Sequence, residues 1–435
     1  MSRPTLPRSS DKELILDINQ LLSGIDCACG RRHECAIKSV YIENGALDRL
    51  RDICAEYDSV LLVADENTFS VAGDKTLSAL CGKKIKKTVF PGSEILIPDE
   101  RAIAAVESEL SDVDLIVGIG SGVIQDLCKY VGYYNNLPYL VVATAPSMDG
   151  YASNGAAMIT GGMKVTYPAG LPIAIVADTE VLKNAPADMI RSGYGDIIGK
   201  FSALNDWKLS RLINGEYFCD YIYDATYEQI MLTINSAAGI IAHDEDSIKQ
   251  LMEALVIIGI MMSFAGSSRP ASGSEHHLSH FFEITGIVDG KDYLPHGTDV
   301  AYSTFVTARL RESILAKKFP CRLYRTSEEE YIKSINAIYK TSADECIKLQ
   351  KKVGNYEAER LDTYLKYERE IKDILSDAPS SEYVSRLLSD AGFDINYFYS
   401  FYGVEKIKNA ISYAKDLKDR YTVLWLYFDL FGDLL

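Results

Sequence analysis

The first part of the chain alternates short apolar runs with amphipathic helical segments, and this alternation restricts the fold more than any other feature. The runs are about five residues long, and each ends in a polar or glycine-containing loop; they lie at 59–64, 87–90, 114–118, 138–144 and 173–177. Continuous apolar strands that feed helices are typical of a parallel sheet with both faces covered. Ligands bind such sheets at the carboxyl ends of the strands, where Asp65, Gly120 and Thr144 fall.

The pattern changes after about Leu182, where strand signals become rare and long stretches with helical periodicity follow, at 192–214, 220–242, 246–264, 274–287 and 296–318. We therefore predict two domains. A Rossmann-like α/β domain spans 1–185, with an N-terminal extension over 1–38, and an all-α domain spans 186–435. Because pockets form preferentially at domain interfaces, we expect the active site between them.

The charge balance excludes two classes of partner. The 435 residues carry 45 basic and 61 acidic side chains, a net charge of −16, which disfavours binding to nucleic acids and to anionic membranes. The longest apolar stretch, 254–265, has 12 residues, whereas a spanning helix needs about 20. The N-terminus lacks a hydrophobic signal region and the nine cysteines are mostly scattered, so we expect a cytoplasmic protein without membrane insertion.

Glycines at 118, 120 and 122 follow a predicted strand and open a predicted helix. Without a Cβ the backbone can approach a pyrophosphate, whose charge is met by the N–H groups of the helix start. Tight strand-to-helix turns use glycine for steric reasons alone, so the spacing leaves both roles open. Asp65 also has two interpretations, a ribose contact or the N-cap of the next helix. Its position before the glycines is unusual, because the acidic residue of the usual dinucleotide-binding fingerprint follows the glycines.

Four of the six histidines, His276, His277, His280 and His296, fall within 21 residues. His276 and His280 share a helical face. Two imidazoles and one carboxylate would leave the open coordination positions that a catalytic metal needs, although a chance grouping of core histidines is the alternative. A carboxylate candidate is Asp196, whose pairing with Lys200 at i+4 is otherwise typical of a surface ion pair. The glycines around Asp196 suggest instead that another element approaches this helix closely.

Five motifs together resemble the bacterial glycerol-1-phosphate dehydrogenases. They are GIGSGVIQD (118–126), TAPSMDGYASNGAAM (144–158), GYGDIIGK (193–200), SRPASGSEHHLSH (268–280) and HG (296–297). The wider superfamily includes glycerol dehydrogenases, iron-type alcohol dehydrogenases and dehydroquinate synthases. The resemblance implies a dehydroquinate synthase-like fold and the reversible reduction of dihydroxyacetone phosphate to sn-glycerol 1-phosphate by NADH or NADPH, with Zn²⁺ or Ni²⁺ in the site. Another polyol dehydrogenase, a lyase on the same scaffold or a non-catalytic nucleotide sensor are the alternatives.

The resemblance also implies residue roles. The metal ligands would be Asp196, His276 and His296. His280 and Asp149 would be catalytic and would contact the substrate together with Asp196. The cofactor contacts would be Asp65, Gly120, Ser121, Gly122, Val123, Ile124, Thr144, Ser147 and Ser153.

Three further expectations rest on the residues themselves. Because a guanidinium fork suits phosphate, Arg269 is a candidate for the substrate phosphate, with a helix-terminal ion pair as the alternative. A short N-terminal segment contains four possible metal ligands, and it would bind a second zinc or form a turn of reduced thiols. These residues are Cys27, Cys29, His33 and Cys35. We expect a homo-oligomer, a dimer or larger, acting on a small phosphorylated substrate.

Overall fold

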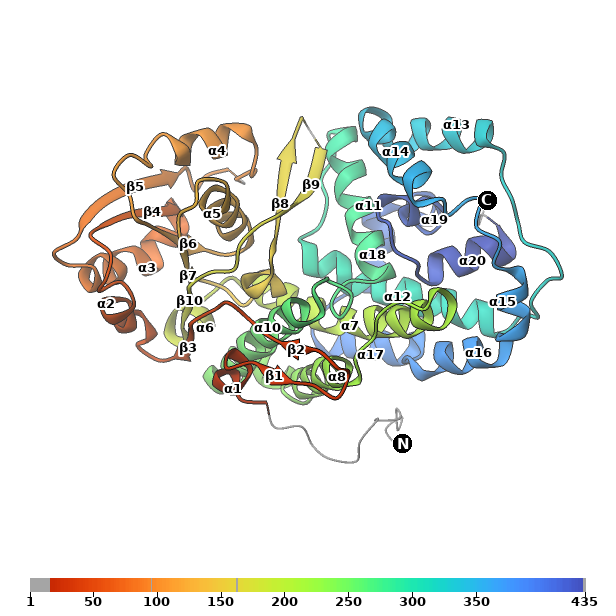
Figure 1. Ribbon diagram of the computed structural model, residues 1–435, viewed down its shortest axis with the longest axis horizontal. Helices are drawn as coiled ribbons and strands as arrows, with labels where there is room; N and C mark the ends of the chain where they lie inside the picture. Colours follow the sequence, from red (N-terminus) through yellow and green to blue (C-terminus); the bar gives the residue numbers. More distant parts are fainter. Residues whose placement is uncertain (1–15, 95, 162, 433–435) are drawn as a thin grey trace. The chain divides into compact units, whose positions relative to one another are not determined.

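The computed structural model of the protein describes residues 16–94, 96–161 and 163–432 (Figure 1). Part of the predicted N-terminal extension, residues 1–15, lies outside the described residues.

A six-stranded, all-parallel sheet forms the α/β part, in the order β3-β10-β7-β6-β4-β5. Its strands are β3 (Ser39–Glu43), β4 (Ser59–Asp65), β5 (Lys84–Phe90), β6 (Leu115–Gly120), β7 (Tyr139–Ala143) and β10 (Ala174–Asp178). Five of the six were predicted as apolar runs, so the parallel sheet is confirmed. β3 was not predicted.

The sheet is buried on both faces, which explains why its central strands are apolar without alternation. One face carries Leu62, Val117 and Val142, which pack against the segments around η1 (Ala46–Arg49), α2 (Leu50–Ile53) and α3 (Glu66–Ala79). α5 (Gly122–Tyr134) packs against β6, where a Cβ on Gly118 would touch Cys128 at 2.9 Å. The edge strand β5 differs, since Lys84 and Lys87 are exposed.

The strand order reverses between β4 and β6. From β4 the chain moves outward to the edge strand β5, and it then returns to β6 on the other side of β4. The carboxyl ends of two strands whose connections diverge leave a crevice, the usual ligand position on such sheets. Asp65 and Gly120 are the last residues of these two strands.

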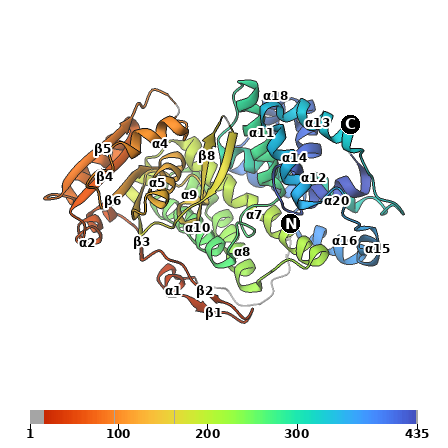
Figure 2. The ribbon, with the colours of Figure 1, turned by 45° about the horizontal axis from the view of Figure 1, so that its top comes forward.

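Two small antiparallel hairpins accompany the sheet, neither of them predicted. β8 (Gly155–Thr160) pairs with β9 (Met163–Pro168), between β7 and β10 in the chain. β1 (Ile25–Asp26) pairs with β2 (Arg32–His33) next to α1 (Ile18–Leu22), and Figure 2 shows these N-terminal elements outside the parallel sheet.

The remaining helices confirm the predicted helical region, since the described residues after β10 contain helices and no strand. They are α4 (Glu100–Glu107) and η2 (Asp149–Ala152) before β10, then α6 (Thr179–Lys183), α7 (Ala187–Asn214), α8 (Asp220–Asn235), α9 (Ala237–Ile241), α10 (Glu245–Ala265), α11 (Ser274–Asp289), α12 (His296–Leu315), α13 (Glu328–Tyr339), η3 (Lys340–Ser342), α14 (Ala343–Val353), α15 (Leu361–Lys366), α16 (Glu368–Asp377), α17 (Ser381–Asp390), α18 (Ile395–Tyr402), α19 (Val404–Tyr413), η4 (Ala414–Leu417) and α20 (Val423–Phe431). Among them α12 is central, packing against α11, α16, α17 and α20.

The described chain divides into two compact units, one of 16–197 with Met231–Ser268 and one of Ile198–Ile230 with 269–432. Residues 231–268 thus group with the parallel sheet, although the sequence assigned them to the helical domain. The predicted division at 185/186 stays a prediction.

Within the described residues one helix, α10, is long and apolar enough to be a membrane-span candidate by composition, and 78% of its most apolar 18-residue window is buried. It packs against η2 and α6 of the same unit. This burial is typical of a core helix, as the sequence predicted for 254–265.

Candidate active site

The three glycines of the β6–α5 loop have different roles. A Cβ on Gly118 would meet Gln125 at 2.9 Å, and one on Gly120 would meet Ile124 at 2.7 Å, so both are required for packing of the strand against its helix. A Cβ on Gly122 would meet only Met148, at 3.6 Å. The steric interpretation therefore holds for Gly118 and Gly120, while Gly122 leaves the start of α5 accessible.

The first turn of α5 is suited to a phosphate. Its N-cap, Ser121, makes no side-chain capping hydrogen bond, so the first N–H groups of the helix are not satisfied by that side chain. These N–H groups and the helix dipole favour an anion. Val123, in the same turn, is partly exposed, whereas Ile124 is buried.

Asp65 caps α3. Its Oδ1 accepts the N–H of Thr68 at 2.8 Å, and the Thr68 hydroxyl closes a capping box. The N-cap interpretation is therefore confirmed for this oxygen. In the described part of the chain no hydrogen bond involves Oδ2, which a ribose hydroxyl could use at the mouth of the crevice.

Two buried side chains that the sequence analysis missed hold this region together. The Gln125 amide donates to the carbonyls of Gly118 at 2.8 Å and Gly120 at 3.1 Å, which fixes the end of β6. The Lys129 ammonium donates to the carbonyls of Gly150 and Gly155, both at 2.9 Å. A polar residue in the apolar face of a predicted helix is the signal that could have found them, since buried polar groups require partners.

The loop after β7 holds three predicted residues. Thr144 donates its N–H to the Gly120 carbonyl at 3.3 Å, next to the glycine loop, and Ser147 is buried beside Tyr151. The Ser153 hydroxyl donates to the Gly150 carbonyl at 3.0 Å and contacts the Lys129 ammonium at 3.2 Å. Through these two contacts Ser153 helps to fix the conformation of the loop.

Asp196, His276 and His296 are brought together although α7, α11 and α12 carry them separately. One ligand atom from each lies within 4.8 Å of the other two. Asp196 is fully buried, and its Oδ2 accepts the backbone N–H of Asp149 at 2.9 Å. A carboxylate and two imidazoles at this separation form a donor set for a divalent cation with open positions.

The ligand candidate His276 is oriented by its neighbour. Its Nδ1 contacts Glu275 Oε1 at 2.7 Å, which leaves Nε2 for a cation, an arrangement common around metal-binding histidines. Burial and the nearby Lys200 hold the pKa of His276 well below its usual range, which favours the neutral imidazole. Burial and the nearby Asp206 raise the pKa of Glu275 to about 8.

His280 and His277 both lie on α11 but differ in their position relative to the group of Asp196, His276 and His296. The His280 ring lies 6.4 Å from that of His276 and 5.8 Å from that of His296 (centroid distances), so it borders the group. His277 is fully buried, outside the group, and it matches no predicted role.

The glycines of α7 allow the close approach that the sequence suggested. A Cβ on Gly193 would lie 1.8 Å from the Pro146 carbonyl oxygen, in the loop that carries Ser147 and Asp149. A Cβ on Gly199 would lie 2.4 Å from Val300 of α12. On both sides of Asp196, α7 therefore packs closely on another element, on backbone at Gly193 and on a side chain at Gly199.

Arg269 is already engaged within the protein. Its Nε donates to Glu216 Oε1 at 2.7 Å, its Nη1 to the Tyr421 carbonyl at 3.0 Å and its Nη2 to the Ser210 hydroxyl at 3.1 Å. The side chain is 4% exposed. This geometry favours the ion-pair interpretation over phosphate binding.

We therefore expect Arg269→Ala to destabilise the protein by about 2–3 kcal/mol, since breaking a buried pair leaves polar groups without partners. The Michaelis constant for the substrate should not change. Denaturant unfolding and steady-state kinetics measure the two effects, and a large rise in the Michaelis constant at unchanged stability would restore the phosphate role.

The comparisons with known proteins agree on one superfamily. A family profile described as iron-containing alcohol dehydrogenase matches residues 41–186. Glycerol-1-phosphate dehydrogenase (NAD(P)+) of Halalkalibacterium halodurans is 33% identical over 323 residues, 72% of this chain and 80% of the relative. The enzyme of the same name from Geobacillus thermodenitrificans is 35% identical over 299 residues, 66% and 74% of the two chains.

A solved structure supports the fold. The alcohol dehydrogenase from Oenococcus oeni superposes with a TM-score of 0.59 at 13% identity, over 89% of this chain and 94% of that one. At this identity the likeness concerns the fold alone.

Proposed function

Because the chain belongs to the glycerol-1-phosphate dehydrogenase family, we propose that it interconverts dihydroxyacetone phosphate and sn-glycerol 1-phosphate with NAD(H) or NADP(H) and a divalent metal. One observation carries the proposal for this chain. Asp196, His276 and His296 come from three helices and still bring their ligand atoms within 4.8 Å of one another.

We assign the nicotinamide cofactor to the carboxyl ends of β4 and β6. In this proposal the N–H groups at the start of α5 hold the pyrophosphate, and Gly122 permits its approach. Asp65 Oδ2 accepts from a ribose hydroxyl. Thr144 and Ser147 border the same loop, and Gln125 keeps the strand end rigid without touching the cofactor.

The metal donor set suits either Zn²⁺ or Ni²⁺, since imidazole and carboxylate bind both. When bound, the cation acts as a Lewis acid on the substrate carbonyl and the nicotinamide supplies hydride. Glu275 orients His276 for this purpose, and the backbone N–H of Asp149 orients Asp196.

His280 is the candidate that delivers the proton which the new hydroxyl group requires. It borders the metal group, and a histidine can exchange a proton near neutral pH. The substrate carries about two negative charges in a protein of net charge −16, so local cations must offset repulsion. With Arg269 occupied by Glu216, the remaining local cations are the metal and Lys200, which lies fully buried one turn after Asp196 on α7.

The test is an assay of metal-stripped protein with dihydroxyacetone phosphate, NADH or NADPH, and Zn²⁺ or Ni²⁺ added back. We expect one nicotinamide to be oxidised for each dihydroxyacetone phosphate reduced at its ketone, with sn-glycerol 1-phosphate as the only enantiomer formed. Turnover of a cyclising substrate with no net NADH change would indicate a lyase. NADH binding without turnover of any polyol phosphate would indicate a sensor.

Two further parts of the proposal concern the protein in the cell. A cytoplasmic location agrees with relatives that are metabolic dehydrogenases. Assembly into a dimer or larger oligomer stays a prediction, which light scattering on the purified protein would test.

A further inference from the structure

A second group of metal-ligating side chains lies in the N-terminal hairpin, apart from the residues used above. The turn between β1 and β2 is closed by the Cys27 N–H, which donates to the Arg31 carbonyl at 3.0 Å, and by the Gly30 N–H, which donates to the Cys27 carbonyl at 3.0 Å. Gly30 has a φ of +84°, a conformation that glycine adopts without strain. This turn brings Cys27, Cys29 and His33 to one side of the hairpin.

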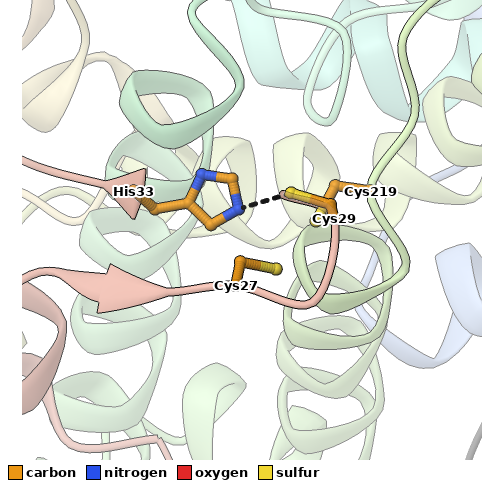
Figure 3. A group of neighbouring side chains, drawn as sticks. All are labelled: Cys27, Cys29, His33 and Cys219. Carbon is orange, nitrogen blue, oxygen red and sulfur yellow. Dashed lines mark hydrogen bonds between the residues drawn. The ribbon is translucent and has the colours of Figure 1, made fainter. Parts of the chain in front are cut away.

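The fourth member comes from a distant part of the sequence. Cys219 directly precedes α8, and one ligand atom each of Cys27, Cys29, His33 and Cys219 lies within 4.8 Å of the others. Figure 3 shows the four side chains next to one another, with the His33 ring nitrogen facing the Cys29 sulfur. His33 and Cys219 are each 1% exposed.

The spacing between Cys29 and His33 matches tetrahedral coordination. Zn–S bonds of about 2.3 Å and a Zn–N bond of about 2.05 Å place sulfur and nitrogen about 3.6 Å apart in a regular tetrahedron. Cys29 Sγ and His33 Nε2 are 3.5 Å apart. The ring of His33 is fixed by stacking on Phe264 of α10, with centroids 5.2 Å apart and planes at 13°. The described residues include all nine cysteines and contain no disulfide.

The sequence analysis grouped Cys35 with these residues, and this part of the prediction is wrong. Cys35 lies outside the group, and its thiol contacts the backbone of Ile37 and the side chain of Ser263. The correct fourth member, Cys219, is 186 positions after His33, beyond the reach of any local spacing rule.

We propose that Cys27, Cys29, His33 and Cys219 form a structural zinc site, distinct from the catalytic metal site. Three thiolates and one imidazole fill all four positions of Zn²⁺, so this site has no vacancy for a substrate. A hairpin with strands of two residues is not stable by itself, and small elements of this kind depend on a metal or a disulfide.

The experiment uses the full chain, purified without chelator. Metal content is measured by plasma mass spectrometry, and the thiols are then titrated with an organomercurial in the presence of a zinc indicator. Thiolate-bound zinc is released by the mercurial, whereas a carboxylate–imidazole site is not. We expect one zinc equivalent per chain to be released. Cobalt substitution should give an intense thiolate-to-cobalt charge-transfer band.

Matched variants separate the two sites. Cys219→Ser should abolish mercurial-released zinc, whereas Cys35→Ser should retain it. His276→Ala should also retain it while losing the catalytic metal. The proposal is overturned if the wild-type protein releases no zinc and shows no charge-transfer band, or if intact-mass analysis finds a disulfide among these cysteines. Neither readout depends on the proposed dehydrogenase activity or on the folding of a variant.

Discussion

His276→Ala is expected to remove the catalytic metal and to lower kcat/KM for dihydroxyacetone phosphate by ~10³-fold or more. A Lewis-acid metal contributes several kcal/mol to the transition state, and about 1.4 kcal/mol corresponds to a tenfold rate change. Loss of one of three ligands should remove a large part of the affinity, because only Asp196 and His296 of the group remain. Elemental analysis and steady-state kinetics on the same sample measure both effects.

The control is His243→Ala. His243 lies outside the histidine group, and its Nδ1 contacts the Lys183 carbonyl at 2.9 Å. We expect this variant to retain both metal and activity. Circular dichroism should show folded protein for His276→Ala. A metal-free His276→Ala protein with wild-type kinetics would contradict the assignment of Asp196, His276 and His296.

Gly193→Ala is expected to destabilise the protein by about 2 kcal/mol or more, although alanine is the better helix former. The gain in helix propensity is about 1 kcal/mol. Against it, the new Cβ would lie 1.8 Å from the Pro146 carbonyl oxygen, and relieving such an overlap typically costs about 1–3 kcal/mol or more. The overlap is with backbone, so the 144–149 loop must move. Since a misplacement of about 1 Å can cost about 10²-fold, kcat/KM should fall by this order.

Gly170→Ala is the matched control, because its Cβ would meet only Tyr133, at an ordinary 3.5 Å. We expect a stability change within about 0.5 kcal/mol. Urea unfolding of both variants gives the comparison. A stabilised Gly193→Ala protein would mean that helix propensity outweighs the contact and that α7 does not pack on the loop at this distance.

The fold could be predicted where burial is complete, and less well where it is partial. β4, β6, β7 and β10 are buried along their length, so each appears in the sequence as an unbroken apolar run. β3 is only half-buried and mixes polar with apolar residues, so it gives no such run. β5 was predicted from 87, although it begins at Lys84, because the lysines of an edge strand resemble a solvated helix end.

The sequence predicts residues of the candidate site but not the side chains that support them. The motifs identify Asp196, His276 and His296, and the structure brings them together. The roles of Lys129 and Gln125 depend on carbonyls of loops that only the fold assembles. Cys219 could not be found from spacing, because its neighbours are fixed by tertiary packing.

The lysines along β5 also restrict how copies of the chain can associate. An edge strand offers unpaired backbone groups to any similar strand that approaches, and lysines on such an edge oppose this pairing. Two β5 edges would bring like charges from Lys84, Lys86 and Lys87 into register. A continuous sheet running through two protomers is therefore disfavoured at this end, and an oligomer has to use helices or the opposite border of the sheet.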